Sequence, residues 1–353
     1  MGIPDARISV SSPFLDGYDE PESLHSSSRA RLAKPTLLAD FLFFFGPHPS
    51  RNCPTTIRYA QQNIACRCQK PVSFSSHSHE NGAIPLLLVS GPQIHLAKED
   101  LRNGVLQAWM WATLAFQDIK MRYRGSILGP FWLTISTLVM VAAIGGIYPR
   151  ILNVRTSDYL PYLATGLVIW SLLASLINEG CSTFLGAQQI IRQVRLPFSL
   201  HVFRSVFRNL IVFAHSFAVI PFVIVIFSVP IGWTTILIFP ALAIVAINGV
   251  WVGILIGMAS ARYRDIPPVI NSFVTVAFFA TPVFWQPHAL GPDHWIVDFN
   301  PLFAALDVMR APLLGIAPSP YSWPMLLVTT ALGGAITFLI FARWRARISY
   351  WAN

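Results

Sequence analysis

The most constraining feature of the sequence is a series of long stretches without Asp, Glu, Lys or Arg. These stretches are Gly125–Pro149, Tyr159–Asn178, Asn209–Ala261, Ile266–Pro292 and Ala311–Ala342. A helix needs about 20 apolar residues to cross a bilayer. A helix also satisfies its backbone hydrogen bonds within one segment, which lipid requires. The pattern therefore predicts an all-α integral membrane protein.

The lengths of these stretches predict the number of membrane-spanning helices. The longest stretch, Asn209–Ala261, has room for two helices, and Pro230-Ile231-Gly232 is the natural break between them. Each of the other stretches has room for one helix. The sequence therefore predicts six spans, at residues 129–149, 160–180, 209–229, 232–259, 269–286 and 325–342.

The basic residues between the predicted spans lie mostly on one side of the membrane. That side carries Lys120, Arg122, Arg124, Arg192, Arg195, Arg204, Arg208, Arg262, Arg264, Arg343, Arg345 and Arg347. The opposite loops carry Arg150, Arg155, Arg310, Asp158, Asp293, Asp298 and Asp307. Because cytoplasmic loops are enriched in Lys and Arg, both ends of the membrane domain are predicted to be cytoplasmic. An even number of spans agrees with that arrangement.

The composition excludes other classes of protein. Hydrophobic residues make up 54% of the chain and charged residues only 12%, whereas soluble domains carry about 25% charged residues. A disordered protein would have low hydrophobicity. The net charge of +9 is spread between the apolar stretches. It therefore indicates orientation in a membrane, and we expect no nucleic-acid partner.

The chain divides near residue 95 into two unlike parts. Residues 1–95 are rich in Ser and Pro and include low-complexity patches such as Ser73–Ser78. Their first residues lack the basic, apolar and small-residue order of a signal peptide. We expect a poorly ordered extension, which a start codon assigned too far upstream would also explain. Residues 96–353 are expected to form the membrane domain.

Two predicted helices lie outside the spans on the cytoplasmic side. Apolar residues recur at helical spacing in Leu101–Tyr123, which predicts an amphipathic helix on the membrane surface. The alternative is a helix that faces a protein partner. The segment Gly186–Leu200 mixes Gln, Ile and Arg and ends near Pro197. It is either a short helix that docks into a soluble partner or a plain basic loop that only sets topology.

The outer segment Gln286–Pro324 is rich in proline and aromatic residues. Asn300 is a good helix N-cap and Pro301 suits the first helical position, so a helix is predicted over Pro301–Arg310. A short apolar helix here could re-enter the bilayer, provided that protein surrounds its ends. The alternative is an interfacial loop with an aromatic belt.

Catalytic and energy-coupling motifs are absent from the sequence. His215 lies alone in a span, where a histidine more often serves helix packing than catalysis. Glu179 lies at the end of a span, where it can be either a functional residue or an edge residue that reaches water. There is no HExxH, GxSxG or phosphate-binding GxxxxGK[ST] motif, and no cysteine pattern typical of a metal site. We expect no catalytic residue, metal or cofactor in this chain. Any ATP with its Mg²⁺ would bind to another subunit.

Four motifs in order resemble the permeases of ABC-2 type polysaccharide exporters. They are Arg122–Trp132 before the first span, Arg262–Ile266 after the fourth, Thr281–Trp285 at the end of the fifth, and Asn300-Pro301 followed by Arg310. The resemblance covers residues 100–350. It implies an N-terminal interface helix, six spans and short re-entrant helices between spans five and six. It also implies a homodimer in a bacterial inner membrane, bound to a separate ATPase and exporting a lipid-linked glycan such as O-antigen, capsule or teichoic acid.

The resemblance also implies roles for particular residues. Residues of the Gly186–Leu200 segment would couple the permease to the ATPase: Gln188, Ile190, Ile191, Arg192, Val194, Arg195 and Pro197. Arg122 and Arg124 lie where a pyrophosphate headgroup would reach the permease, although they could be topology anchors only. Sugar rings stack on aromatic faces, so a channel could be lined by Phe131, Trp132, Tyr159, Tyr162, Trp170, Phe284 and Trp285. The alternative for these rings is a lipid-facing belt.

Three other functions remain open at this point. The nearest is an exporter of drugs or lipids with the same architecture. A membrane-bound glycosyl- or acyltransferase would require His215 or Glu179 to be catalytic. An unpowered channel is the third, although the spans contain no ring of charges that would select ions.

Overall fold

The computed structural model describes residues 90–351 apart from 130, 231 and 288–294. Throughout these ranges the regular structure is helical, with no strand, so the all-α prediction is confirmed for them. The predicted extension 1–95 lies almost entirely outside the described residues. The first described helix, α2 (Gly91–Leu106), begins a few residues before the predicted domain boundary.

Five helical stretches are long and apolar enough to cross a membrane. They are α4 (Phe131–Leu152), α5 (Thr156–Gly186), α7 with α8 (Phe198–Phe217 and Val219–Ile226), η1 with α9 (Trp233–Leu237 and Ile238–Arg262), and α13 (Ser322–Trp351). They coincide with the predicted spans 129–149, 160–180, 209–229, 232–259 and 325–342. These five predictions are confirmed as apolar helices of sufficient length.

The predicted span 269–286 is not confirmed as a single long helix. The helix found there, α10 (Ile266–Ala280), has 15 residues, and at about 1.5 Å per residue it is shorter than a bilayer core of about 30 Å. Thr281 is extended, with φ −96° and ψ 137°. Pro282 explains this conformation, because the residue before a proline is pushed out of the helical region.

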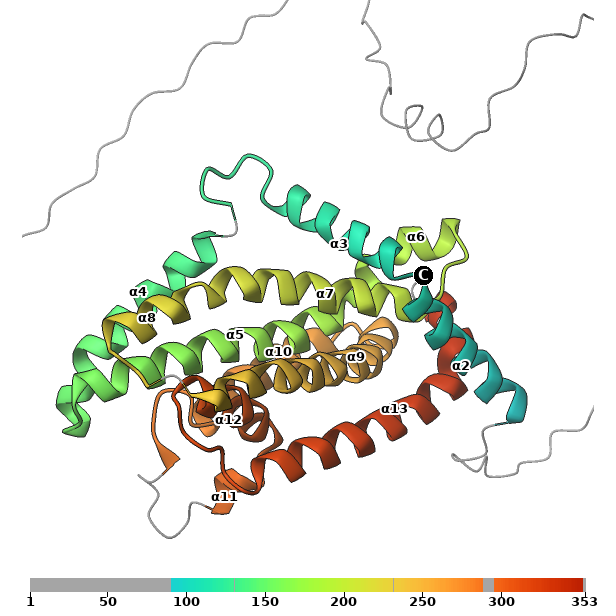
Figure 1. Ribbon diagram of the computed structural model, residues 1–353. Helices are drawn as coiled ribbons and strands as arrows, with labels where there is room; N and C mark the ends of the chain where they lie inside the picture. The colour runs from blue at the N-terminus through green and yellow to red at the C-terminus, as the bar shows by residue number, and fades with distance from the viewer. Residues whose placement is uncertain (1–89, 130, 231, 288–294, 352–353) are drawn as a thin grey trace, which may run out of the picture. The chain divides into compact units, whose positions relative to one another are not determined.

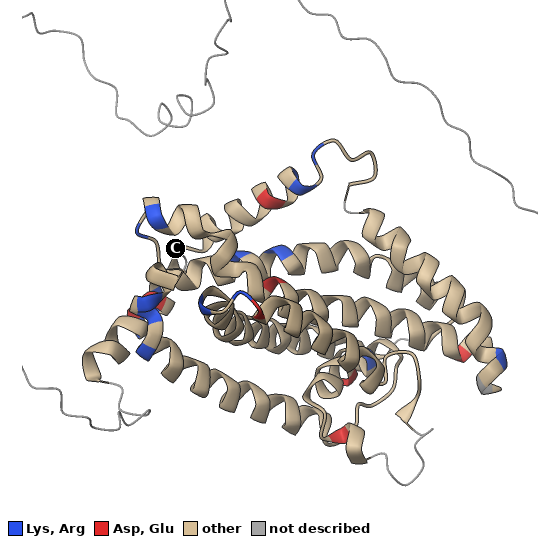
Figure 2. Cartoon of the chain, turned by 180° about the vertical axis from the view of Figure 1, so that it is seen from behind, with Lys and Arg blue, Asp and Glu red and all other residues tan. Residues whose placement is uncertain are grey.

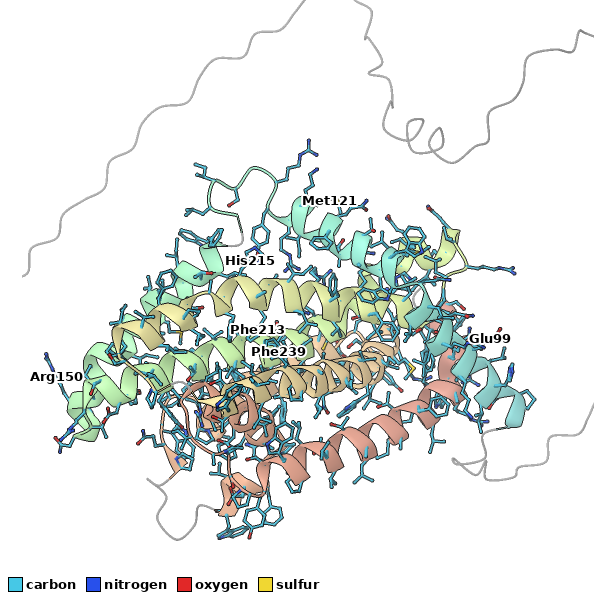
Figure 3. The ribbon with its side chains drawn as sticks, viewed as in Figure 1. Glu99, Met121, Arg150, Phe213, His215 and Phe239 are labelled. Carbon is cyan, nitrogen blue, oxygen red and sulfur yellow. The ribbon has the colours of Figure 1, made fainter. Side chains whose placement is uncertain are left out.

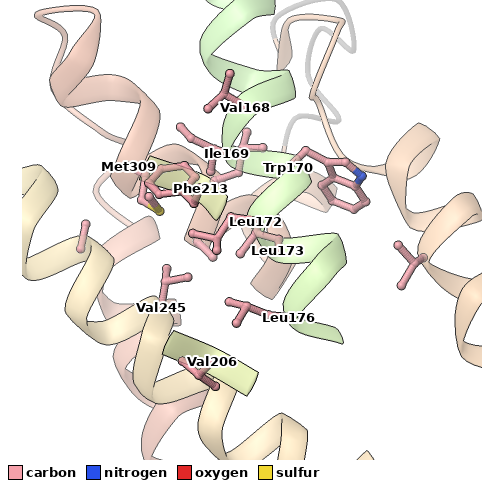
Figure 4. Close-up of a cluster of buried hydrophobic side chains, with 14 of the residues drawn as sticks. Val168, Ile169, Trp170, Leu172, Leu173, Leu176, Val206, Phe213, Val245 and Met309 are labelled. Carbon is pink, nitrogen blue, oxygen red and sulfur yellow. The ribbon is translucent and has the colours of Figure 1, made fainter. Parts of the chain in front are cut away.

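The hydrophobic core is built around α5, which contacts α4, α7, α9, α10 and α12. Leu172, Leu173 and Leu176 of α5 are buried against residues of α7 and α9 such as Val206 and Val245 (Figure 4). Because α5 has neighbours on all sides, it is the most buried of the five long stretches. It therefore acts as the scaffold on which the other helices are placed.

Glycines allow α5 and α9 to approach closely. A Cβ atom on Gly180 would lie 3.2 Å from the Cα of Gly253, and a Cβ on Gly257 would lie 3.0 Å from the carbonyl oxygen of Gly180. Small residues spaced four apart commonly bring membrane helices together in this way. The contact fixes α9 against α5 along much of its length.

The predicted amphipathic helix 101–123 is two helices. The first, α2, packs on α7 and α13, and α3 (Ala108–Arg122) packs on α7, with a break at Gln107. Ala115 of α3 faces the bundle, whereas Trp109 and Phe116 are exposed. The amphipathic character that the sequence predicts is not tested by these exposures. Its contact with lipid remains a prediction.

The predicted helix after Asn300 is confirmed. Helix α12 (Pro301–Leu313) follows the short α11 (Trp295–Asp298), and the Asn300 side chain accepts a hydrogen bond from the Leu302 N–H at 2.9 Å. Most of α12 is buried against α5, α9, η1 and α13 (Figure 1). Protein therefore surrounds this apolar helix within the chain.

Candidate functional site

Charged residues gather where α3, α6 (Gln188–Gln193), the start of α7 and the ends of α9 and α13 lie (Figure 2). We call this region the basic end of the bundle, defined by Arg122, Arg204, Arg208, Arg262 and Arg345. Arg150 lies at the opposite end from Glu99 of α2 (Figure 3). The arginines that are unevenly distributed along the sequence are thus concentrated at one end of the helical bundle.

Five side chains from three helices form an ion network at the basic end. Asp118 of α3 accepts hydrogen bonds from Arg204 Nε at 2.7 Å and from Arg208 Nη1 at 2.8 Å. Arg208 Nη2 also donates to Glu179 Oε2 of α5 at 2.6 Å. Arg122 Nη2 donates to the other oxygen of Glu179 at 3.0 Å. The network joins α3 to both α5 and α7.

The electrostatics of the network favour ionised carboxylates. Burial acts to raise the pKa of Asp118, but the hydrogen bonds and charges of Arg204 and Arg208 outweigh it and hold that pKa below its usual value. The Asp118 side chain is only 11% exposed, so water screens these pairs weakly. The network therefore holds the helices most firmly when Asp118 is charged.

We expect an Asp118→Asn variant to be less stable than the wild type by roughly 2 kcal/mol, somewhat less than the loss of a fully buried ion pair. Because the folded-state pKa is lowered, this stabilisation is present at neutral pH and is lost as the pH falls through that pKa. Thermal unfolding in detergent at neutral and acidic pH measures both effects. Glu99→Gln is the matched control, because Glu99 is exposed and its ion-pair partner, His95, lies as far as 4.0 Å away. Equal losses in the two variants would contradict a structural role for the network.

The predicted coupling segment forms α6 and a linker to α7. Helix α6 contains Gln188, Ile190, Ile191 and Arg192, and an extended linker contains Val194, Arg195 and Pro197. Ile191 packs partly against the core, whereas Val194 is half exposed. A cavity of about 630 Å³ lies beside the linker and is lined by α2, the end of α6, the linker, the start of α7 and the end of α13. Arg192 and Arg195 line this cavity.

Asp100 anchors the linker where it joins α7. Its carboxylate accepts hydrogen bonds from the N–H groups of Phe198 and Ser199, at 3.1 and 3.0 Å. Arg345 Nε of α13 donates to the same carboxylate at 2.8 Å. A carboxylate at a helix N-terminus also interacts favourably with the helix dipole. Asp100 thus ties α2, α7 and α13 together, a role that the sequence reasoning missed.

At the opposite end, α5 and α12 hold the turn Thr281–Trp285. The Tyr162 hydroxyl donates to the carbonyl of Trp285 at 2.8 Å, and the Tyr159 hydroxyl donates to that of Phe284 at 2.7 Å. The buried Arg310 donates to the Pro282 carbonyl at 2.8 Å, and its guanidinium lies 4.0 Å from the centre of the Tyr162 ring. Two of the four sequence motifs therefore meet here, with α5 beside them.

The predicted aromatic residues divide into a group at the Thr281–Trp285 turn and a pair at the start of α4. Phe131 and Trp132 at the start of α4 are exposed, and Trp170 is buried with its ring 5.7 Å from that of Phe278. Tyr159 and Tyr162 are buried and their hydroxyls are engaged by backbone. Arg124 lies in the loop between α3 and α4, apart from the network that binds Arg122. The structure thus brings Tyr159, Tyr162, Trp170, Phe284 and Trp285 together at the Thr281–Trp285 turn and leaves out Phe131 and Trp132. Their role in a channel remains a prediction.

His215 has partners that suit helix packing. Its Nδ1 lies 2.8 Å from the carbonyl oxygen of Ile211 one turn earlier, and its ring centre lies 5.7 Å from that of Phe131 in an edge-to-face arrangement. Glu179 is paired with two arginines.

The fold and the charged end define a helical membrane protein. The sequence profile of the ABC-2 type transporter family matches residues 111–314, and the chain belongs to this family. Two relatives from Klebsiella pneumoniae, both O-antigen export system permease proteins RfbA, are 27% and 24% identical over 192 and 196 residues. Each alignment covers 53% of this chain and 73% of the relative. The Myxococcus xanthus protein of the same name is 22% identical over 176 residues, or 49% of this chain and 66% of its own length.

Proposed function

We propose that the chain is the transmembrane permease of an ATP-driven exporter that moves a lipid-linked polysaccharide across a bacterial inner membrane. Membership of the ABC-2 type transporter family is the observation that carries the proposal. The names of its relatives, which are permeases for O-antigen export, support the choice of substrate class. In this account the chain itself performs no covalent chemistry.

ATP with Mg²⁺ would bind to a separate ATPase subunit at the cytoplasmic, basic end. Helix α6 and its linker are suited to receive this subunit, because they carry exposed Val194, Arg192 and Arg195 beside an open cavity. Asp100 connects the linker to α2, α7 and α13, so a push on α6 would reach three helices at once. Closure of the ATPase around ATP would thereby be transmitted to the spans.

A second copy of the chain would complete the channel beside α10. That helix exposes Phe273 and Val276 and also three polar side chains, Asn271, Ser272 and Thr275. Polar side chains within an apolar helix are better accommodated by a water-filled passage or a partner helix than by lipid. The Ser272 and Thr275 hydroxyls already donate to the carbonyls of Pro268 and Asn271, at 3.0 and 2.9 Å, so a homodimer with α10 next to the glycan path would chiefly accommodate the Asn271 amide.

The remaining topology follows from this role. Helix α10 would act as the sixth span with the turn Thr281–Trp285 completing its path through the bilayer. Helices α11 and α12 would re-enter from the outer surface, a placement supported by the burial of α12 within the chain. Helices α2 and α3 would lie along the cytoplasmic surface.

Deletion of the gene in its native bacterium tests the substrate class. We expect surface polysaccharide to be lost and lipid-linked glycan to accumulate inside the cell, because synthesis would continue without export. Surface staining and extraction of lipid-linked glycans measure the two effects, and complementation by the wild-type gene is the control. Unchanged surface glycan together with a changed drug susceptibility or membrane lipid composition would instead indicate a drug or lipid exporter.

A further inference from the structure

A second pocket at the basic end lies between the last turns of α9 and α13. It has a volume of about 300 Å³, and its walls include Leu255, Met258 and Ile340 together with Trp344 and Trp351. Arg262, the last residue of α9, is the only charged residue that lines it. The pocket is separate from the ion network of Asp118 and from the cavity beside α6.

The guanidinium of Arg262 is surrounded by aromatic rings. It lies 5.0 Å from the ring centre of Tyr263, 5.2 Å from that of Trp351 and 5.8 Å from that of Trp344. Among the described residues, no carboxylate forms an ion pair with Arg262, unlike Arg122, Arg204, Arg208 and Arg345. The positive charge is therefore held in place without being neutralised.

This arrangement leaves the donors of Arg262 available to an anion. Aromatic rings interact with the faces of a guanidinium, whereas its N–H donors point outward in its plane. Those donors match two oxygens of a phosphate group. Arg347, whose guanidinium lies 4.7 Å from the Trp344 ring centre, places a second positive charge beside the same aromatic group.

The walls of the pocket indicate a lipid rather than a free ion. Arg262 stands where the apolar run of α9 ends, and tryptophans are enriched at the headgroup level of membranes. Below the guanidinium, Leu255 and Ile340 offer an apolar surface that an acyl chain can cover and inorganic phosphate cannot. Basic pockets between membrane helices are known to hold anionic headgroups.

We propose that this pocket binds the phosphate headgroup of an anionic membrane phospholipid, with an acyl chain along Leu255 and Ile340. Arg262 binds the phosphate, Arg347 adds charge, and the rings of Trp344 and Trp351, 5.8 and 5.2 Å from the Arg262 guanidinium, keep it oriented. A lipid held there bridges α9 and α13 beside the loop to α10. The proposal does not depend on which substrate the protein exports.

Lipid binding by the purified full chain in detergent tests the proposal. Native mass spectrometry with added phosphatidylglycerol or phosphatidylcholine gives apparent affinities for the two headgroups. We expect the wild type to prefer phosphatidylglycerol about tenfold and Arg262→Gln to lose that preference. Arg264→Gln, which removes a charge from an exposed neighbour, is expected to keep it.

Two further measurements separate the alternatives. Ile340→Phe should weaken phosphatidylglycerol binding without changing any charge, because it narrows the apolar part of the pocket. Millimolar inorganic phosphate should not displace the lipid. Equal binding by the Arg262→Gln and Arg264→Gln variants, or full displacement by phosphate, would overturn the proposed lipid site.

Discussion

A Val194→Asp variant is expected to lose its partner ATPase and, with it, all ATP-dependent export. Val194 is 50% exposed in the linker between α6 and α7, next to the cavity lined by Arg192 and Arg195. A central apolar contact of an interface contributes about 2 kcal/mol or more, and a new charge there also has to be desolvated. Binding should therefore weaken by at least about thirtyfold.

The readout is the amount of ATPase that copurifies with the tagged variant in mild detergent. Val194 suits this test better than Ile191, because Ile191 packs partly on the core and its replacement would also disturb the fold. Thr156→Asp adds the same charge to an exposed position at the opposite end of the bundle and should retain the ATPase. If Val194→Asp retained as much ATPase as Thr156→Asp, the linker would not be the docking segment.

Replacing Gly166 with leucine is expected to prevent stable folding. A Cβ atom on Gly166 of α5 would lie 2.5 Å from the carbonyl oxygen of Val283, within the turn that follows α10. The contact would be between the helix backbone at Gly166 and the backbone carbonyl of Val283, so no side-chain rotation could relieve it. Overpacking a core costs about 1–3 kcal/mol when side chains can adjust, so we expect a larger loss here.

Monodispersity and thermal unfolding in detergent measure this loss. Gly146→Leu is the matched control, because a Cβ on Gly146 of α4 meets nothing within 4 Å. The control should unfold close to the wild-type temperature. Equal behaviour of the two variants would mean that the Thr281–Trp285 turn does not pack against α5 as described.

The lengths of the stretches without charged residues correctly predicted most of the long helices. They located the five long apolar helices, and the Asn300-Pro301 pair located the start of α12. They did not locate the end of α10, where apolar residues continue past Ala280 but Pro282 forces Thr281 out of the helix. The proline was the available signal, and counting apolar residues alone ignored it.

The candidate site was less predictable, because its parts come from distant segments. The spacing of Arg204 and Arg208 places both on one face of a helix, which indicates a shared partner. Nothing in the sequence says that Asp118 and Glu179 are those partners. Likewise, the aromatic character of Tyr159 and Tyr162 indicated a channel lining, while their hydroxyls bind the carbonyls of a turn 120 or more residues away. Such contacts depend on the packing of whole helices.

Purification of the tagged chain from its native membranes in mild detergent, with ATP hydrolysis measured on the eluate, tests most directly whether a separate ATPase drives this permease. We expect a stoichiometric ATPase subunit bound to a dimer of the chain, with ATP hydrolysis that disappears in the Val194→Asp variant. A homo-oligomer without a bound subunit or ATP hydrolysis, found in several detergents, would contradict the proposed powered exporter.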